Sequence, residues 1–173
     1  MKINFFKVII FSFVVFFLLI FLLGLKKDNN YSTKNLTGNK ISSFQLKSIN
    51  NDNLISEETL KKNQYTLINF FASWCAPCRA EHKYLLNLSS QKKEIKIIGI
   101  NFKDKKINAN NFLRALGNPY DFVGEDTDGK ISISFGIYGI PESILLNNEL
   151  TIIKKIIGPI DQIQFDDILK IIQ

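Results

Sequence analysis

Cysteine and histidine are scarce in this sequence, and their scarcity excludes several classes of small protein. Its 173 residues include two cysteines, Cys75 and Cys78, and one histidine, His82. Two thiols cannot build a disulfide-stapled mini-protein or a four-cysteine zinc site. With 46% hydrophobic and 22% charged residues, the chain is not a disordered protein either. Its stability must come from the packed core of one domain or slightly more.

Acidic residues are absent from the first 27 positions, where four of the 22 basic residues lie. The net charge of +6 therefore comes largely from the N-terminal segment. A basic face on a folded domain is the electrostatic signature of nucleic-acid binding, and this distribution does not provide one. We expect no nucleic-acid partner.

The same N-terminal segment is strongly apolar. From Ile3 to Leu25 it carries one charged residue, Lys7. As a helix it would extend roughly 34 Å, enough to cross the hydrocarbon core of a bilayer. We therefore predict a membrane anchor over residues 1–27. A cleaved signal peptide is the alternative, but the stretch is longer than a usual h-region and no small-x-small cleavage site follows it.

The rest of the chain divides into a linker and a domain. Residues 28–40 are polar and show no apolar periodicity, which predicts a linker. The folded domain is expected over 41–173. Ser56, followed by Glu57 and Glu58, indicates the N-cap and first turn of a short helix.

Two short apolar runs, Thr66–Ala72 and Ile95–Ile100, predict buried central strands. A helix between them, from Pro77 to near Ser90, would complete a βαβ unit with a right-handed crossover. Further along, the patterns predict helices over Asn108–Leu116 and from Gly129 to Phe135, strands over Ser143–Leu146 and Thr151–Ile157, and a last helix over Asp161–Ile172. We expect this last helix to bury Ile163, Ile168, Leu169 and Ile172. The fold class is α/β, with a mixed central sheet flanked by helices.

The two cysteines stand where the first predicted strand meets the first long helix. The segment reads Trp74-Cys75-Ala76-Pro77-Cys78-Arg79. Amides of the first helical turn and the helix dipole would stabilise a thiolate on Cys75, and a thiolate is the attacking species in disulfide exchange. Cys78, one turn further on, could then resolve a mixed disulfide.

Other uses of the cysteine pair fit less well. A structural disulfide would close a loop of two intervening residues, for which the entropic gain is small. A metal site from Cys75, Cys78 and His82 would lack a fourth ligand. Haem attachment requires histidine directly after the second cysteine, where Arg79 stands. We expect redox exchange, with no metal and no cofactor.

Together these motifs resemble the thioredoxin superfamily, and within it the membrane-tethered DsbE/CcmG type of thiol:disulfide interchange protein used in cytochrome c maturation. The segments that carry the resemblance are Trp74–His82, Gly99–Asp104, Leu116–Tyr120, Asp126–Gly129 and Gly136–Ser143. The resemblance implies a thioredoxin-like fold. It also implies that the Ile140–Pro141 peptide bond is cis and faces the cysteines, and that Glu81 and Glu142 are acidic residues near them.

Asn69 bears on the mechanism. Thioredoxins commonly carry a buried acid at this strand position, six residues before the first cysteine, and here the side chain is a neutral amide. The proton role then moves to Glu81, three residues after Cys78, whose pKa burial would raise. The alternative is a solvated acid in the first turns of the helix. For His82 we expect a surface position, and for Asp126–Gly129 a turn rather than a calcium loop.

The sequence thus predicts a protein-disulfide oxidoreductase with catalytic Cys75, Cys78, Glu81, Pro141 and Glu142. By resemblance, it would reduce apocytochrome c or a thiol-bearing maturation partner before haem attachment, with electrons from a membrane-embedded thiol donor. It would be a single-pass protein of the bacterial inner membrane with its catalytic domain in the periplasm. The alternatives are a general periplasmic thiol reductase and a non-catalytic binding module of cytochrome maturation.

Overall fold

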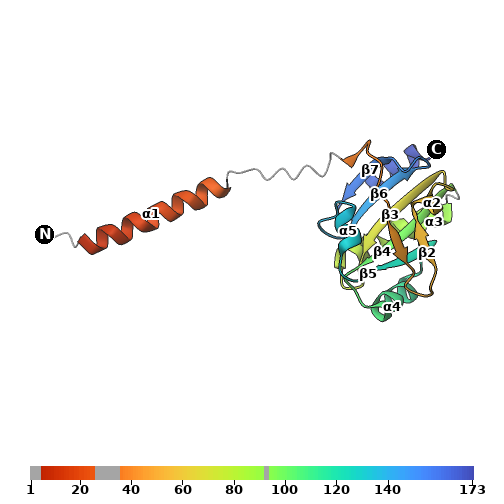
Figure 1. Cartoon of the computed structure of the whole chain (residues 1–173), viewed down its shortest axis with the longest axis horizontal. Helices are drawn as coiled ribbons and strands as arrows, with labels where there is room; N and C mark the ends of the chain where they lie inside the picture. The colour runs from red at the N-terminus through yellow and green to blue at the C-terminus, as the bar shows by residue number, and fades with distance from the viewer. Residues whose placement is uncertain (1–4, 26–35, 92–93) are drawn as a thin grey trace. The chain divides into compact units, whose positions relative to one another are not determined.

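The computed structural model describes residues 5–25, 36–91 and 94–173 (Figure 1). The chain divides into two units, Met1–Ser32 and Thr33–Gln173. The first contains helix α1, Phe5–Leu25, whose side chains from Phe6 to Leu22 are exposed. Within the residues whose side chains are described, no helix is both long and apolar enough to cross a membrane. Residues 1–4, 26 and 27 of the predicted anchor and 28–35 of the predicted linker lie outside the described residues.

The second unit is built on a five-stranded sheet with the strand order β5-β4-β3-β6-β7. The strands are β3 Tyr65–Phe71, β4 Ile95–Phe102, β5 Phe122–Asp126, β6 Glu142–Asn147 and β7 Ile152–Ile157. β3, β4 and β5 run parallel, whereas β6 is antiparallel to both β3 and β7. The predicted mixed α/β sheet is therefore confirmed.

Alternation along β3 divides the core into two layers. Leu67 and Phe71 join the apolar cluster that α3 (Ala76–Gln91), α4 (Lys106–Leu116) and α6 (Gln162–Ile171) form on one face. Ile68 and Phe70 point to the other face. The elements that cover that face are the hairpin of β1 (Gln45–Lys47) and β2 (Leu54–Ser56), α2 (Glu57–Leu60), and α5 (Lys130–Ser134) with the residues that follow it.

The topology brings two segments to one edge of the sheet. β3 ends at Phe71 and α3 begins at Ala76, so the predicted redox motif lies at the carboxyl end of the central strand. β6 runs antiparallel to β3 and pairs its first residue, Glu142, with Phe70. The segment that precedes β6 therefore lies at the same edge. It contains the Ile140–Pro141 peptide bond, which is cis, as the resemblance implies.

Two elements of the domain differ from the sequence expectations. β5 is not predicted, because Gly124 interrupts its short apolar pattern; the glycine is required there, since a Cβ atom would overlap the Leu46 side chain. In α6, Ile163 is 68% exposed, whereas Phe165 and Ile168 are buried. The prediction for Ile163 is wrong because positions 165, 168 and 172 share one helical face and 163 does not.

Part of the predicted linker contacts the domain. Leu36 packs against the apolar cluster that contains Phe135, and Gly38 N donates a hydrogen bond to Ile152 O. Ile41 N continues this pairing to Leu150 O. Residues 38–41 thus pair with residues 150–152 at the start of β7, which the polar composition of residues 38–40 does not predict.

Candidate active site

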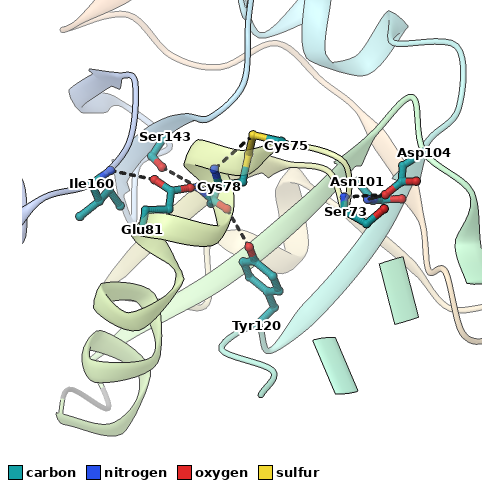
Figure 2. Close-up of a disulfide and its surroundings, with 10 residues drawn as sticks. Ser73, Cys75, Cys78, Glu81, Asn101, Asp104, Tyr120, Ser143 and Ile160 are labelled. Atoms are coloured by element: carbon teal, nitrogen blue, oxygen red, sulfur yellow. Dashed lines mark hydrogen bonds between the residues drawn. A yellow bond between two sulfur atoms is a disulfide. The ribbon is translucent and has the colours of Figure 1, made fainter. Parts of the chain in front are cut away.

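Cys75 and Cys78 are joined by a disulfide at the start of α3 (Figure 2). Cys75 directly precedes the first residue of the helix, and Cys78 lies in its first turn. Both are buried, and the Cys78 backbone N–H donates to Cys75 Sγ at 3.2 Å. In the reduced protein this amide and the positive end of the helix dipole would favour a thiolate on Cys75. The geometry therefore suits Cys75 as the attacking sulfur.

The loop before Cys75 is held by the end of β4. Ser73 N donates to Asp104 Oδ2 at 2.7 Å, and Asn101 Nδ2 donates to the same oxygen at 3.3 Å. Partial burial raises the pKa of Asp104, but the hydrogen bonds from Ser73 and Asn101 outweigh it and leave this pKa lowered. Asp104 thus remains ionised at neutral pH. The exposed Trp74 is also bound to the segment that follows β4, because its Nε1 donates to Lys103 O.

Glu81 lies below the disulfide in a fully buried polar network (Figure 2). Asn69 Nδ2 donates to Glu81 Oε1 at 2.8 Å and to Ser143 Oγ at 3.0 Å. Tyr120 Oη donates to Asn69 Oδ1 at 2.8 Å, and Ile160 N donates to Glu81 Oε2 at 2.8 Å. Both carboxylate oxygens of Glu81 therefore face hydrogen-bond donors.

Burial controls the ionisation of this carboxylate. Glu81 is 1% exposed, and its loss of hydration raises its pKa to about 7, although the hydrogen bonds from Ile160 and Asn69 act in the opposite direction. The alternative of a solvated acid is thereby wrong. A carboxyl group that is half protonated near neutral pH can either accept or donate a proton.

Glu142 does not point freely into the site. It is buried, and its Oε2 atom lies 3.0 Å from Lys155 Nζ. Its Oε1 atom accepts hydrogen bonds from Tyr138 N and Gly139 N. This acid is therefore engaged by its neighbours at the start of β6.

His82 is 3% exposed, so the expected surface position is wrong. Its Nε2 atom lies 2.9 Å from Gly117 O, and its ring packs edge-on against Phe112. Burial lowers its pKa, which favours the neutral ring. Its helix position, four residues after Cys78 on the core side of α3, is the signal that could have predicted burial.

Asp126 ends β5 at the turn predicted there. Its carboxylate accepts hydrogen bonds from Ile131 N, Ser132 N and Ser132 Oγ. It therefore fixes the start of α5. Over the described part of the chain, no group of three or more His, Cys, Asp or Glu side chains could hold a metal ion.

Several residues of the site are not predicted from the sequence in these roles. Tyr120 and Ser143 reach Asn69 from other strands and loops, and no local pattern signals such contacts. Lys155 does leave a signal. In the apolar strand Ile152–Ile157, Lys154 and Lys155 are adjacent, so alternation directs one of them inward, where it requires an acidic partner.

Comparisons with known proteins identify the family of this chain. A family model described as Redoxin matches residues 36–172. The thiol:disulfide interchange protein CycY of Rhizobium leguminosarum is 49% identical over 57% of this chain and 52% of its own length. HelX of Rhodobacter capsulatus, also named a thiol:disulfide interchange protein, is 32% identical over 79% of this chain and 77% of its own length.

Solved structures show the same fold. A thiol:disulfide interchange protein of the thioredoxin family from Chlorobium tepidum superposes with a TM-score of 0.65 at 26% identity, over 76% of this chain and 94% of that one. The match to CycY spans about half of that relative's length. The chain therefore belongs to the Redoxin family and, within it, to the DsbE-type thiol:disulfide interchange proteins.

Proposed function

We propose that this protein is a thiol:disulfide oxidoreductase that reduces disulfides in a polypeptide partner. One observation carries the proposal: the Cys75–Cys78 disulfide lies at the N-terminus of α3, and the same helix carries the buried carboxyl group of Glu81 three residues after Cys78 (Figure 2). A disulfide that only cross-linked the chain would not require an ionisable group with a pKa near 7 beneath it.

The exchange begins on the reduced protein. The Cys75 thiolate attacks one sulfur of the substrate disulfide, forming a mixed disulfide and releasing the other substrate sulfur as a thiolate. Cys78 then loses its proton and attacks Cys75 Sγ. The bond between Cys75 and the substrate breaks, and the second substrate thiolate leaves. Two electrons pass to the substrate, and the Cys75–Cys78 disulfide remains.

Glu81 serves the second attack in this proposal. Its ionised form accepts the Cys78 proton, directly or through one water molecule, and its protonated form later returns a proton when the disulfide is reduced again. Asn69 fixes the carboxylate by donation from Nδ2, and Ile160 N fixes the other oxygen. Pro141 is assigned a place beside the sulfur atoms because the cis bond lies at the same edge of the sheet.

The substrate we propose is apocytochrome c, or a thiol-bearing partner in its maturation. Haem attachment to a Cys-x-x-Cys-His segment requires both thiols free, whereas an oxidising compartment favours their disulfide. A tethered reductant removes this conflict. The apolar run from Ile3 to Leu25 supports an anchor in the bacterial inner membrane with the domain in the periplasm, and a membrane-embedded dithiol protein would regenerate the reduced form.

Cysteine variants of the full chain in detergent test the chemistry. Cys78→Ser should accumulate mixed disulfides with polypeptides through Cys75, because the resolving thiol is absent. Cys75→Ser should accumulate few, since the remaining thiol lies inside the helix. Non-reducing electrophoresis measures both. Faster alkylation of Cys78 than of Cys75 in the reduced protein at neutral pH would reverse the assignment, and no trapped species in either variant would favour a non-catalytic binding module.

A further inference from the structure

Strand β7 carries a lysine whose charged end is buried. The side chain of Lys155 is 3% exposed, and its Nζ atom lies 3.0 Å from Glu142 Oε2. The same atom donates a hydrogen bond of 2.6 Å to Gly136 O. A lysine is almost never buried without a partner, because loss of hydration disfavours its charge. The fold therefore depends on this ion pair. The backbone groups that the two side chains bind indicate what the pair does.

Those groups all belong to the segment Gly136–Gly139, which we call the pre-proline segment. Lys155 holds its first carbonyl group, while Glu142 Oε1 accepts from Tyr138 N and Gly139 N at 3.1 Å each. The segment has glycine at both ends, and glycine samples many backbone conformations. The start of the segment is also held by hydrogen bonds from Gly136 N to Ile133 O and from Ile137 N to Ser132 O, whereas the buried ion pair holds its remaining amides and its first carbonyl group.

The position of this segment connects it to the disulfide. Glu142 pairs with Phe70 at the carboxyl end of β3, and the Cys75 motif follows that strand. Ile140, between the pre-proline segment and Pro141, packs against the apolar cluster that contains both cysteines. A polypeptide whose disulfide is attacked by Cys75 must therefore pass close to the pre-proline segment.

Two exposed side chains near this segment are largely apolar. The Tyr138 side chain is 75% exposed, and Ile157, which pairs with Glu142 across β6 and β7, is also exposed. Gly158 N donates to Pro141 O, which holds the end of β7 against the proline. An extended polypeptide with apolar side chains beside its disulfide is the partner that this surface fits.

We propose that Lys155 is a positioning residue: through its ion pair with Glu142 it holds the pre-proline segment in the conformation that receives a polypeptide, and so sets the affinity for polypeptide disulfides. Lys155 takes no part in the sulfur chemistry. The inference rests on the proposed oxidoreductase function and adds to it a specificity determinant on β7.

Two disulfide substrates separate affinity from chemistry. One is a peptide with a single internal disulfide and an apolar residue beside each cysteine; the other is 2-hydroxyethyl disulfide, which has no polypeptide chain. Each is mixed with the reduced full chain in detergent. Oxidation, followed by the fluorescence of Trp74, gives a half-saturating concentration and a limiting rate for the peptide, and a second-order rate constant for the small disulfide.

Lys155→Met should raise the half-saturating peptide concentration about tenfold, the effect of losing the hydrogen bond to Gly136 O and the ion pair with Glu142. The limiting rate and the reaction with 2-hydroxyethyl disulfide should stay at the wild-type values. Glu142→Gln should also raise the half-saturating peptide concentration, and the double variant should raise it no further than Lys155→Met, because the two side chains act as one unit. Lys154→Met is the matched control, since that lysine pairs with Asp167 at 2.8 Å from the same strand.

Three results would overturn the proposal. Equal peptide affinity in Lys155→Met and Lys154→Met would show that the buried pair does not serve binding. An equal loss of reactivity toward both substrates in Lys155→Met would show that Lys155 acts in the chemistry or in general stability. If Lys155→Met does not fold, Lys155→Arg, which keeps the charge, replaces it and must retain more peptide affinity than Glu142→Gln. A wild-type protein that reacts with neither substrate would refute the proposed function itself, whereas a reactive wild type with an indifferent Lys155 refutes only this inference.

Discussion

The side-chain amide of Asn69 donates a 2.8 Å hydrogen bond to the Glu81 carboxylate, and both side chains are sealed from solvent. A neutral amide on β3 and an acid on α3 thus form one buried hydrogen-bonded pair. The acid is thereby carried by the same helix as the sulfur atoms, three residues after Cys78. This placement is the reason for proposing Glu81 as the proton acceptor for Cys78.

Glu81→Gln should change how reactivity depends on pH. If Glu81 accepts the Cys78 proton, the wild-type rate of mixed-disulfide resolution should rise through pH 7, where its carboxyl group ionises. The variant should lack that step, because glutamine does not titrate. Stopped-flow resolution and thiol alkylation of the reduced protein between pH 4 and 9 measure this. Glu58→Gln, at an exposed position on α2, is the control, and identical profiles in all three proteins would exclude a proton role for Glu81.

Glu81→Gln should also change how the free energy of unfolding depends on pH. The folded protein retains the Glu81 proton up to about pH 7, whereas the unfolded chain releases it near the ordinary glutamate pKa of 4.5. Between these values the folded state binds more protons, so the free energy of unfolding falls as pH rises. A shift of this size corresponds to about 3 kcal/mol. Denaturant unfolding of the oxidised protein should show that fall in the wild type and in Glu58→Gln, and a flatter dependence in Glu81→Gln.

Tyr120→Phe should weaken the hydrogen bond from Asn69 to Glu81, because Tyr120 donates to Asn69. Burial, together with the nearby charge of Glu81, raises the pKa of Tyr120 well above its ordinary value, so the hydroxyl group remains a donor to Asn69. Its removal leaves Asn69 Oδ1 buried without that donor, which should cost about 1–3 kcal/mol of stability. The amide can then rotate away from Glu81, and the pH step in resolution should move upward.

Tyr84→Phe is the control for that variant, because Tyr84 lies on α3 with its ring against Phe165. Equal stability loss in both variants, with an unmoved pH step in Tyr120→Phe, would show that Tyr120 only fills the core. A step that moves in Tyr120→Phe alone would assign it to the positioning of Glu81.

How far the sequence predicts this site depends on how local each signal is. Cys75, Cys78 and the helix that follows them are encoded within a few residues, and the cis bond at Pro141 follows from a motif that resembles a known family. Ser143 and Tyr120 reach Asn69 only because β6 and the loop before β5 are brought beside β3, which is long-range information. The prediction for Ile163 is wrong for the opposite reason, since the local apolar pattern places this residue on the buried face of the helix, whereas its side chain is exposed.

The substrate itself gives the last prediction. The reduced full chain should reduce a peptide disulfide within a Cys-x-x-Cys-His segment faster than it reduces insulin. The reason is the proposed function, since both thiols of that segment must be free before haem attaches. The measurement is the rate of disulfide loss for each substrate at equal concentration, with Cys75→Ser as the inactive control. The helix N-terminus alone does not set a preference, since it favours the Cys75 thiolate toward any disulfide. Turnover of insulin at a comparable or higher rate would therefore refute the specificity and identify a general thiol reductase with the same chemistry.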